Sequence, residues 1–297
     1  TIAIPILSFI LLLKLTEWVA LKVNKAMNME GICIPHLSGI VHFPISVIGN
    51  SIIDKIPGLN KIKSDPDTLQ EKLGLLGEPM IMGLILGLLL GISAGYGFKD
   101  ILSVGVKFAA VILILPMMGG ILGKSLIPIS EGMKTFMKKN LPNMGQTYIG
   151  LDVAVLFGLP ENIVTALLLI PTSILLAIIL PGVNFIPLGD LTNLLVPVAF
   201  ITLATRGNIF RSYIIGIPIV VLTLYSASWM APMLTDMAAV ANFQVADTSG
   251  LFTSFLDGGN IFRTWITMIF TGSKFGFILI PIVIWLIYVT WKQRLEA

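Results

Sequence analysis

The chain has 297 residues, of which 56% are hydrophobic and 12% are charged, and its formal net charge is +3. Soluble domains carry about 25% charged residues, so this composition excludes an ordinary soluble domain and predicts a membrane protein with several spans. The small net charge does not indicate a nucleic-acid partner, and the single cysteine, Cys33, excludes an internal disulfide framework.

The first predicted elements are a span and a broken apolar segment. A span needs about 20 mainly apolar residues, and residues 2–21 supply the first one directly after Thr1. This start lacks the charged region of a signal peptide, so we expect the chain to begin inside a longer protein. The segment 30–53 is apolar but is interrupted by Pro35 and His36, which favours a re-entrant hairpin over a continuous span.

A polar loop at residues 54–77 follows the first broken segment. Its lysines predict a cytoplasmic position under the positive-inside rule; they are Lys55, Lys61, Lys63 and Lys72. The second half contains another broken segment at 146–160 and a longer external stretch at 231–263. Further spans are expected at residues 79–96, 101–123, 163–180, 191–204, 213–230 and 275–291. The expected fold is therefore an all-α membrane protein with about seven spans, two re-entrant segments and a cytoplasmic C-terminus.

Ionisable side chains lie in or beside the broken segments and at the start of a span. Four of them are candidates for a site: Glu30, His36, Glu78 and Asp152. Such side chains are costly within apolar membrane sequence unless they have a role. The pattern predicts a polar substrate that is handled inside the bilayer.

Six ordered motifs resemble the galactitol-type membrane component (EIIC) of the bacterial sugar phosphotransferase system. In chain order they are EGICIPH, DKIPGLNKIK, GEP, GLD, PLGDL and RGNIFR. The resemblance runs through nearly the whole chain and corresponds to the later part of a family member, because such proteins carry further spans upstream. It implies a multi-pass protein of the bacterial plasma membrane, with a dimerising scaffold and a mobile core that carries the sugar by an elevator-like movement.

The resemblance also implies a reaction and its partners. The membrane component binds galactitol or a related polyol, and a separate partner (EIIB), served by EIIA, donates phosphate from a phosphocysteine. A homodimer in the lipid bilayer is expected, with no cofactor, no metal and no covalent phosphorylation site on this chain. Cys33 lies between two isoleucines, so we interpret it as a packing residue and not as the phosphocarrier.

The four candidate residues have functional and structural interpretations. His36 is the predicted catalytic and substrate-binding residue, because an imidazole can bind a hydroxyl and accept its proton; alternatively it is tied to a backbone carbonyl. Glu30, Glu78 and Asp152 are predicted to accept hydrogen bonds from substrate hydroxyls. The glutamates could instead cap helices, and Asp152 could be a partner of His36 or a lysine. His42 is interpreted as structural.

Two other classes of function are compatible with the same residues. A proton-coupled secondary transporter would use the same broken segments and leave its substrate unmodified. A membrane scaffold or sensor would not transport at all. The basic residues of loop 54–77, together with Arg206 and Arg211, could dock a phosphorylated partner, although the topology rule alone is sufficient to explain them.

Overall fold

The computed structural model describes residues 3–64, 68, 71, 74–140, 148–242 and 250–294, and helices dominate it. The α-helices are α1 Ala3–Met27, α2 Leu37–Ile40, α3 Phe43–Asp54, α5 Pro79–Ser93, α6 Phe98–Asn140, α7 Pro160–Ile179, α8 Leu195–Thr205, α9 Ile209–Val240, α10 Ile261–Phe270, α11 Lys274–Ile278 and α12 Ile280–Gln293. Short 3₁₀ helices lie at η1 Leu59–Lys61, η2 Gly74–Gly77, η3 Val153–Gly158 and η4 Leu188–Leu194. The chain is helical through nearly all of its described apolar sequence.

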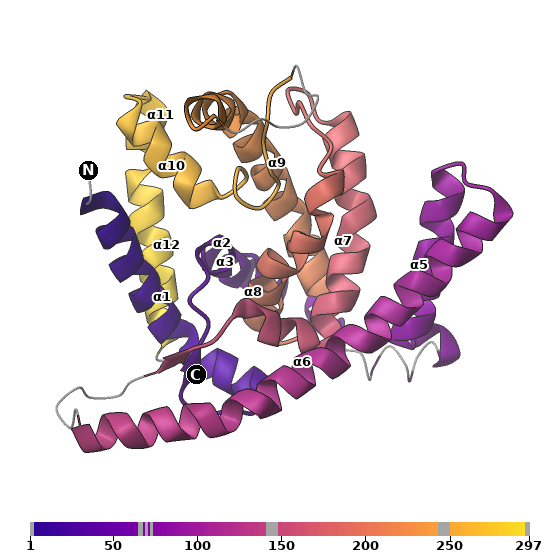
Figure 1. The fold of residues 1–297 in the computed structure, drawn as a ribbon, viewed down its shortest axis with the longest axis horizontal. Helices are drawn as coiled ribbons and strands as arrows, with labels where there is room; N and C mark the ends of the chain where they lie inside the picture. Colours follow the sequence, from indigo (N-terminus) through magenta and orange to yellow (C-terminus); the bar gives the residue numbers. More distant parts are fainter. Residues whose placement is uncertain are drawn as a thin grey trace.

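The helices form a main body and a projecting hairpin (Figure 1). In the body, α1 packs on α12 at one edge, α7 packs on α9, and α3 packs on α8. The short α2 lies near the centre of the view, and α5 and α6 form the hairpin, with α6 continuing beneath the body (Figure 1). Gly39 in α2 lies so close to α8 that a Cβ atom there would overlap the Phe200 ring. This contact fixes the position of α2 on α8.

The two expected broken segments meet in the fold. Strand β1 (Ile32–Cys33) pairs in parallel with β2 (Ile149–Gly150). The backbone N–H of Leu151 donates to the carbonyl of Cys33 at 2.9 Å. After β1 the chain forms α2 and α3, and after β2 it forms η3. The pairing brings the polar residues of both segments near one another. Their re-entrant character stays a prediction, since Leu37–Asp54 is long and apolar enough to cross a membrane.

The described helices lie where the sequence predicts spans, but several differ from the predicted spans in length. Three are long and apolar enough to cross a membrane: Leu37–Asp54, Pro160–Ile179 and Ile209–Val240. Four shorter apolar helices are also present among the described residues, including Ile261–Phe270 and Ile280–Gln293. The predicted span at 101–123 continues as one helix of 43 residues, because the lysines and methionines beyond it favour helix. The stretch 231–263, expected to be external, contains the end of α9 and the start of α10.

Two buried clusters hold the body together. One joins β1, η3 and α8 through Ile32, Leu156 and Phe200. The other joins α7, α8 and α9 and includes Leu169 and Leu224. The first cluster includes residues next to the polar positions that follow β1 and β2, such as Ile34 and Val153. The apolar core therefore positions those polar residues.

Candidate functional site

His36 lies at the start of α2. Its carbonyl oxygen accepts the N–H groups of Gly39 and Ile40 at 3.1 and 2.9 Å, and its backbone is extended there. The imidazole is half-buried, and its Nδ1 is buried without a hydrogen-bond partner among the described residues. No described backbone carbonyl holds the ring, in contrast to the structural alternative. The side chain therefore retains its hydrogen-bonding capacity for a ligand.

Three charged side chains lie close enough to act on His36 electrostatically: Asp152, Asp257 and Arg263. We call these three and His36 the polar hollow. Asp152 is exposed and begins η3, where its carboxylate accepts the N–H of Ala154 at 2.8 Å. It lies two residues after β2, and His36 lies three residues after β1. The pairing of the strands explains why the two lie near one another.

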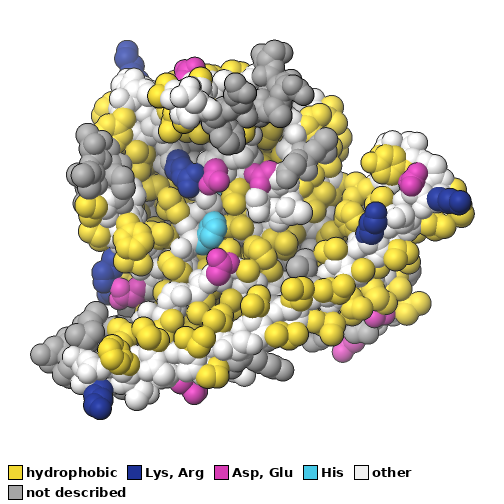
Figure 2. Space-filling model, viewed as in Figure 1, with side chains coloured by type: hydrophobic (Ala, Val, Ile, Leu, Met, Phe, Trp, Pro, Cys, Tyr) yellow, Lys and Arg dark blue, Asp and Glu magenta, His cyan; other side chains and the backbone are white. Residues whose placement is uncertain are grey.

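Asp257 reaches the polar hollow from the turn before α10, and Arg263 reaches it from the first turn of that helix. Their side chains form an ion pair, with Arg263 Nη1 at 2.7 Å from Asp257 Oδ1 and 46% and 64% of the two side chains exposed. Figure 2 shows a histidine side chain in a hollow of this face, with acidic and basic side chains around it. The other histidine, His42, is buried. The hollow thus joins residues from the two broken segments and from a third part of the chain.

The turn that carries Asp257 is tied to the body at several points. Asn260 is 1% exposed, and its amide donates to the hydroxyl of Ser38 at 3.0 Å. Its Oδ1 accepts the N–H groups of Phe262 and Arg263 at the start of α10. Asp190 Oδ2 accepts the N–H of Leu256 at 2.8 Å. These bonds fix Asp257 and Arg263 relative to α2.

Two glycines make this turn possible. A Cβ at Gly258 would clash with Thr253, and one at Gly259 would clash with the carbonyl of Phe255 and with Thr223 of α9. Only glycine can bring the backbone this close to its neighbours. The Asp-Gly-Gly-Asn sequence at 257–260 is the signal in the chain that could have indicated a built turn here.

The two predicted glutamates precede other elements, β1 and α5. Glu30 is exposed before β1. Glu78 begins α5 without a side-chain capping bond, and α5 packs on α6 and α7, whereas α2 packs on α1, α3 and α8. Neither glutamate is among the charged groups that act on His36. Their part in a site stays a prediction.

A second polar region lies where α8 meets α9. It is a cavity of about 340 Å³ that includes Asp54, Lys63, Arg206 and Arg211. Arg211 contacts Asp54 at 2.6 Å, the side chain of Asn50 at 2.8 Å and the carbonyl of Asn60 at 2.9 Å. Part of the predicted docking surface, Lys63, Arg206 and Arg211, therefore lies together; Lys72 is outside the described residues.

The polar hollow has the chemistry of a site for a neutral polyhydroxyl compound. Carboxylates accept hydrogen bonds from hydroxyl groups, a guanidinium donates them, and an imidazole can do either. Charges of both signs surround His36, so the hollow does not favour a strongly charged ligand. An imidazole beside a bound hydroxyl can also take its proton.

Comparisons with known proteins place the chain in a family. Residues 1–249 match "PTS system sugar-specific permease component". The "PTS system galactitol-specific EIIC component" of Escherichia coli (strain K12) is 35% identical over 283 residues, which are 94% of this chain and 62% of that protein. A provisionally named permease IIC component of the same strain is 37% identical over 255 residues, 84% of this chain and 57% of that protein.

The chain spans about three fifths of the length of these relatives. No solved structure matches it. The family match nevertheless covers most of the chain, and the six motifs named above lie within it. The chain belongs to the family of sugar-specific EIIC permease components of the phosphotransferase system, which are integral membrane components.

Proposed function

We propose that this chain binds a polyol, with galactitol as the leading substrate, and presents it to a phosphorylated EIIB partner. The relative named galactitol-specific supports the substrate, and the family supports EIIB as the phosphate donor and EIIA as the protein that serves it. The protein would act in the bacterial plasma membrane as a homodimer with its C-terminus in the cytoplasm. Its core would move the polyol across the bilayer in an elevator-like manner.

The observation that carries this proposal is the polar hollow. His36 has a half-buried imidazole without a described hydrogen-bond partner, and two carboxylates and Arg263 stand around it. An unpartnered buried polar atom costs about 1–3 kcal/mol. A substrate hydroxyl that bonds to the ring offsets part of that cost, whereas Asp152, Asp257 and Arg263 would hold the remaining hydroxyls.

In the proposed transfer, one hydroxyl of the polyol attacks the phosphorus of the EIIB phosphocysteine. A new O–P bond forms while the P–S bond breaks, and its electron pair leaves with the sulfur as a thiolate. The hydroxyl proton passes to the imidazole of His36. Asp152 and Asp257 would favour the resulting imidazolium, because nearby negative charges stabilise a cation.

The test is phosphoenolpyruvate-dependent formation of labelled polyol phosphate. Membranes with the full-length protein are supplied with the soluble phosphocarriers and a panel headed by galactitol. We expect phosphorylated product, and none when EIIB is left out. Accumulation of unmodified polyol driven by a proton gradient would instead favour secondary transport, with Glu78, Asp152 and His36 as candidates for the coupling site.

A further inference from the structure

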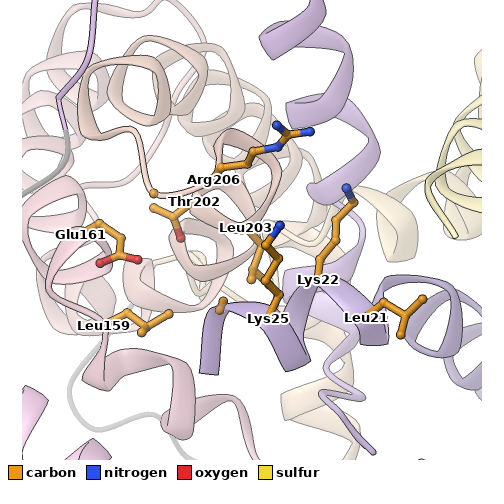
Figure 3. Close-up of a pocket in the computed structure, with 10 residues that line it drawn as sticks. Leu21, Lys22, Lys25, Leu159, Glu161, Thr202, Leu203 and Arg206 are labelled. Carbon is orange, nitrogen blue, oxygen red and sulfur yellow. The ribbon is translucent and has the colours of Figure 1, made fainter. Parts of the chain in front are cut away.

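A basic pocket lies at one end of the body, away from the residues assigned to the polyol. Its volume is about 310 Å³, at the lower end of the range for ligand sites. We call it the basic pocket; Leu21, Lys22, Lys25, Leu159, Glu161 and Arg206 are among its lining residues. Figure 3 shows Lys22 and Lys25 rising from α1, Arg206 beyond them, and Glu161 on the other side of the opening.

The basic pocket lies at the level where spans begin and end. Leu159 and Glu161 flank the first residue of α7, and Arg206 lies three residues before α9. Both α7 and α9 are long and apolar enough to cross a membrane. Lys25 lies in the last turn of α1. Lipid headgroups lie at the ends of spans, and basic pockets between helices at that level bind lipid phosphate.

The charge of the basic pocket favours an anion. It contains three cationic side chains and one carboxylate. Lys25 and Arg206 form no ion pair with any residue that the structure describes. Glu161 lies against the turn, where a Cβ at Gly207 would be 3.3 Å from its Oε1. The pocket therefore keeps an excess of positive charge around its opening.

Arg206 is held in place by an unusual backbone. It caps α8 in the left-handed conformation, with φ 56° and ψ 44°, which is disfavoured for a residue with a Cβ. The N–H of Gly207 donates to the carbonyl of Thr202 at 2.9 Å and closes this turn. A glycine would fit the conformation without strain. An arginine there is consistent with a use for its side chain.

We propose that the basic pocket binds the phosphate group of an anionic phospholipid. Arg206 and the two lysines would contact the phosphate, and the apolar lining would contact the glycerol and the start of an acyl chain. Leu21, Leu159 and Leu203 supply that lining, and Leu21 is 41% exposed beside the cations. A small inorganic anion would leave the exposed side chain of Leu21 uncovered, so an amphipathic ligand fits better. This lipid site is independent of the substrate proposed above.

The test is lipid binding by the full-length protein in detergent, followed by native mass spectrometry. Phosphatidylglycerol is compared with phosphatidylcholine of the same acyl chains, and inorganic phosphate is added in a separate arm. The double variant Lys25→Gln with Arg206→Gln removes two cations and keeps a non-glycine residue at 206. The matched control is Lys55→Gln with Lys61→Gln, which changes charge equally outside the pocket.

We expect selective retention of phosphatidylglycerol and an apparent Kd about tenfold higher in the pocket variant. The control should bind like the parent protein, and Lys25→Arg with Arg206→Lys should restore binding. Equal retention of phosphatidylglycerol by the parent and the pocket variant would overturn the proposal. If the pocket variant lost only the binding of inorganic phosphate and kept that of phosphatidylglycerol, the pocket would be a site for a soluble anion instead. If the pocket variant bound lipid normally but no longer bound phosphorylated EIIB, the pocket would be a docking site for that partner.

Discussion

At the scale of single residues, His36 makes the sharpest prediction. If its imidazole accepts the hydroxyl proton, His36→Ala should lower turnover by about 10²- to 10⁴-fold and weaken polyol binding much less. Asp152→Asn should weaken both, because a carboxylate that holds a hydroxyl acts before and during the transfer. Labelled-polyol binding and phosphorylation are measured on the same membranes.

The control for these variants is Asp100→Asn, an exposed carboxylate in the first turn of α6. It should leave binding and turnover unchanged. Equal losses of binding and turnover in His36→Ala would mean that the ring only holds the polyol. Full activity in His36→Ala would remove it from the site.

Asn260 makes a second prediction at this scale. Asn260→Ala removes the cap of α10 and the bond to Ser38. A lost cap costs about 1 kcal/mol, and the Ser38 hydroxyl left without this partner adds about 1–3 kcal/mol. We expect a lower thermal unfolding midpoint in detergent and weaker polyol binding. The exposed Asn140→Ala is the control, and an unchanged midpoint for Asn260→Ala would show that the turn is held without it.

The sequence indicated some members of the polar hollow and not others. His36 and Asp152 could be selected because they interrupt apolar segments, where ionisable groups are rare. Asp257 and Arg263 could not, because they lie in a stretch of mixed polarity that resembles an external loop. Their position beside His36 depends on the bond between Asn260 and Ser38, which are 222 residues apart. A contact between residues so far apart depends on the tertiary structure, so no local pattern in the sequence indicates it.

At the scale of elements, the α5–α6 hairpin depends on glycines spaced four residues apart. Gly83, Gly87 and Gly91 all face α6, and a Cβ at Gly87 would be 2.8 Å from the Cα of Gly105. Such close approach of helices is a packing mode of membrane proteins. Gly87→Leu should therefore force the helices apart and cost about 1–3 kcal/mol.

The measurement is the unfolding midpoint of the purified protein. Gly132→Leu is the matched control, because Gly132 lies on α6 with no neighbouring atom within 4 Å of an added Cβ. It should be neutral or slightly stabilising, since leucine favours helix over glycine. A similar loss in both variants would show that the hairpin does not depend on close packing at Gly87.

Elements were predicted well where apolar length was the signal and less well elsewhere. The apolar run at 163–180 became α7 with nearly the same bounds. The pairing of β1 with β2 could not be predicted, because each strand has two residues and periodicity needs several. The length of α6 was also missed, since its second half is too polar to count as a span.

At the scale of the whole molecule, basic residues from distant parts of the chain gather at one end. Lys25 and Arg206 line the basic pocket, and Arg206 also lines the cavity that contains Lys63 and Arg211. Figure 1 shows the end of α12 beside the end of α1 at this end of the body. Under the positive-inside rule, we expect this end to face the cytoplasm. These basic residues follow different predicted spans in the sequence, and the fold brings them together at one end.

This orientation can be tested with single added cysteines and a membrane-impermeant maleimide. Lys61 follows Asn60, whose carbonyl accepts from Arg211 at the basic end, whereas Lys99 begins α6 at the far end of α5, at the tip of the hairpin. Lys61→Cys should be labelled in inside-out vesicles, and Lys99→Cys in right-side-out vesicles. The parent protein is the control, because its one cysteine, Cys33, is buried. The reverse pattern would place the basic pocket in the outer leaflet and exclude Lys63, Arg206 and Arg211 as a surface for a cytoplasmic partner.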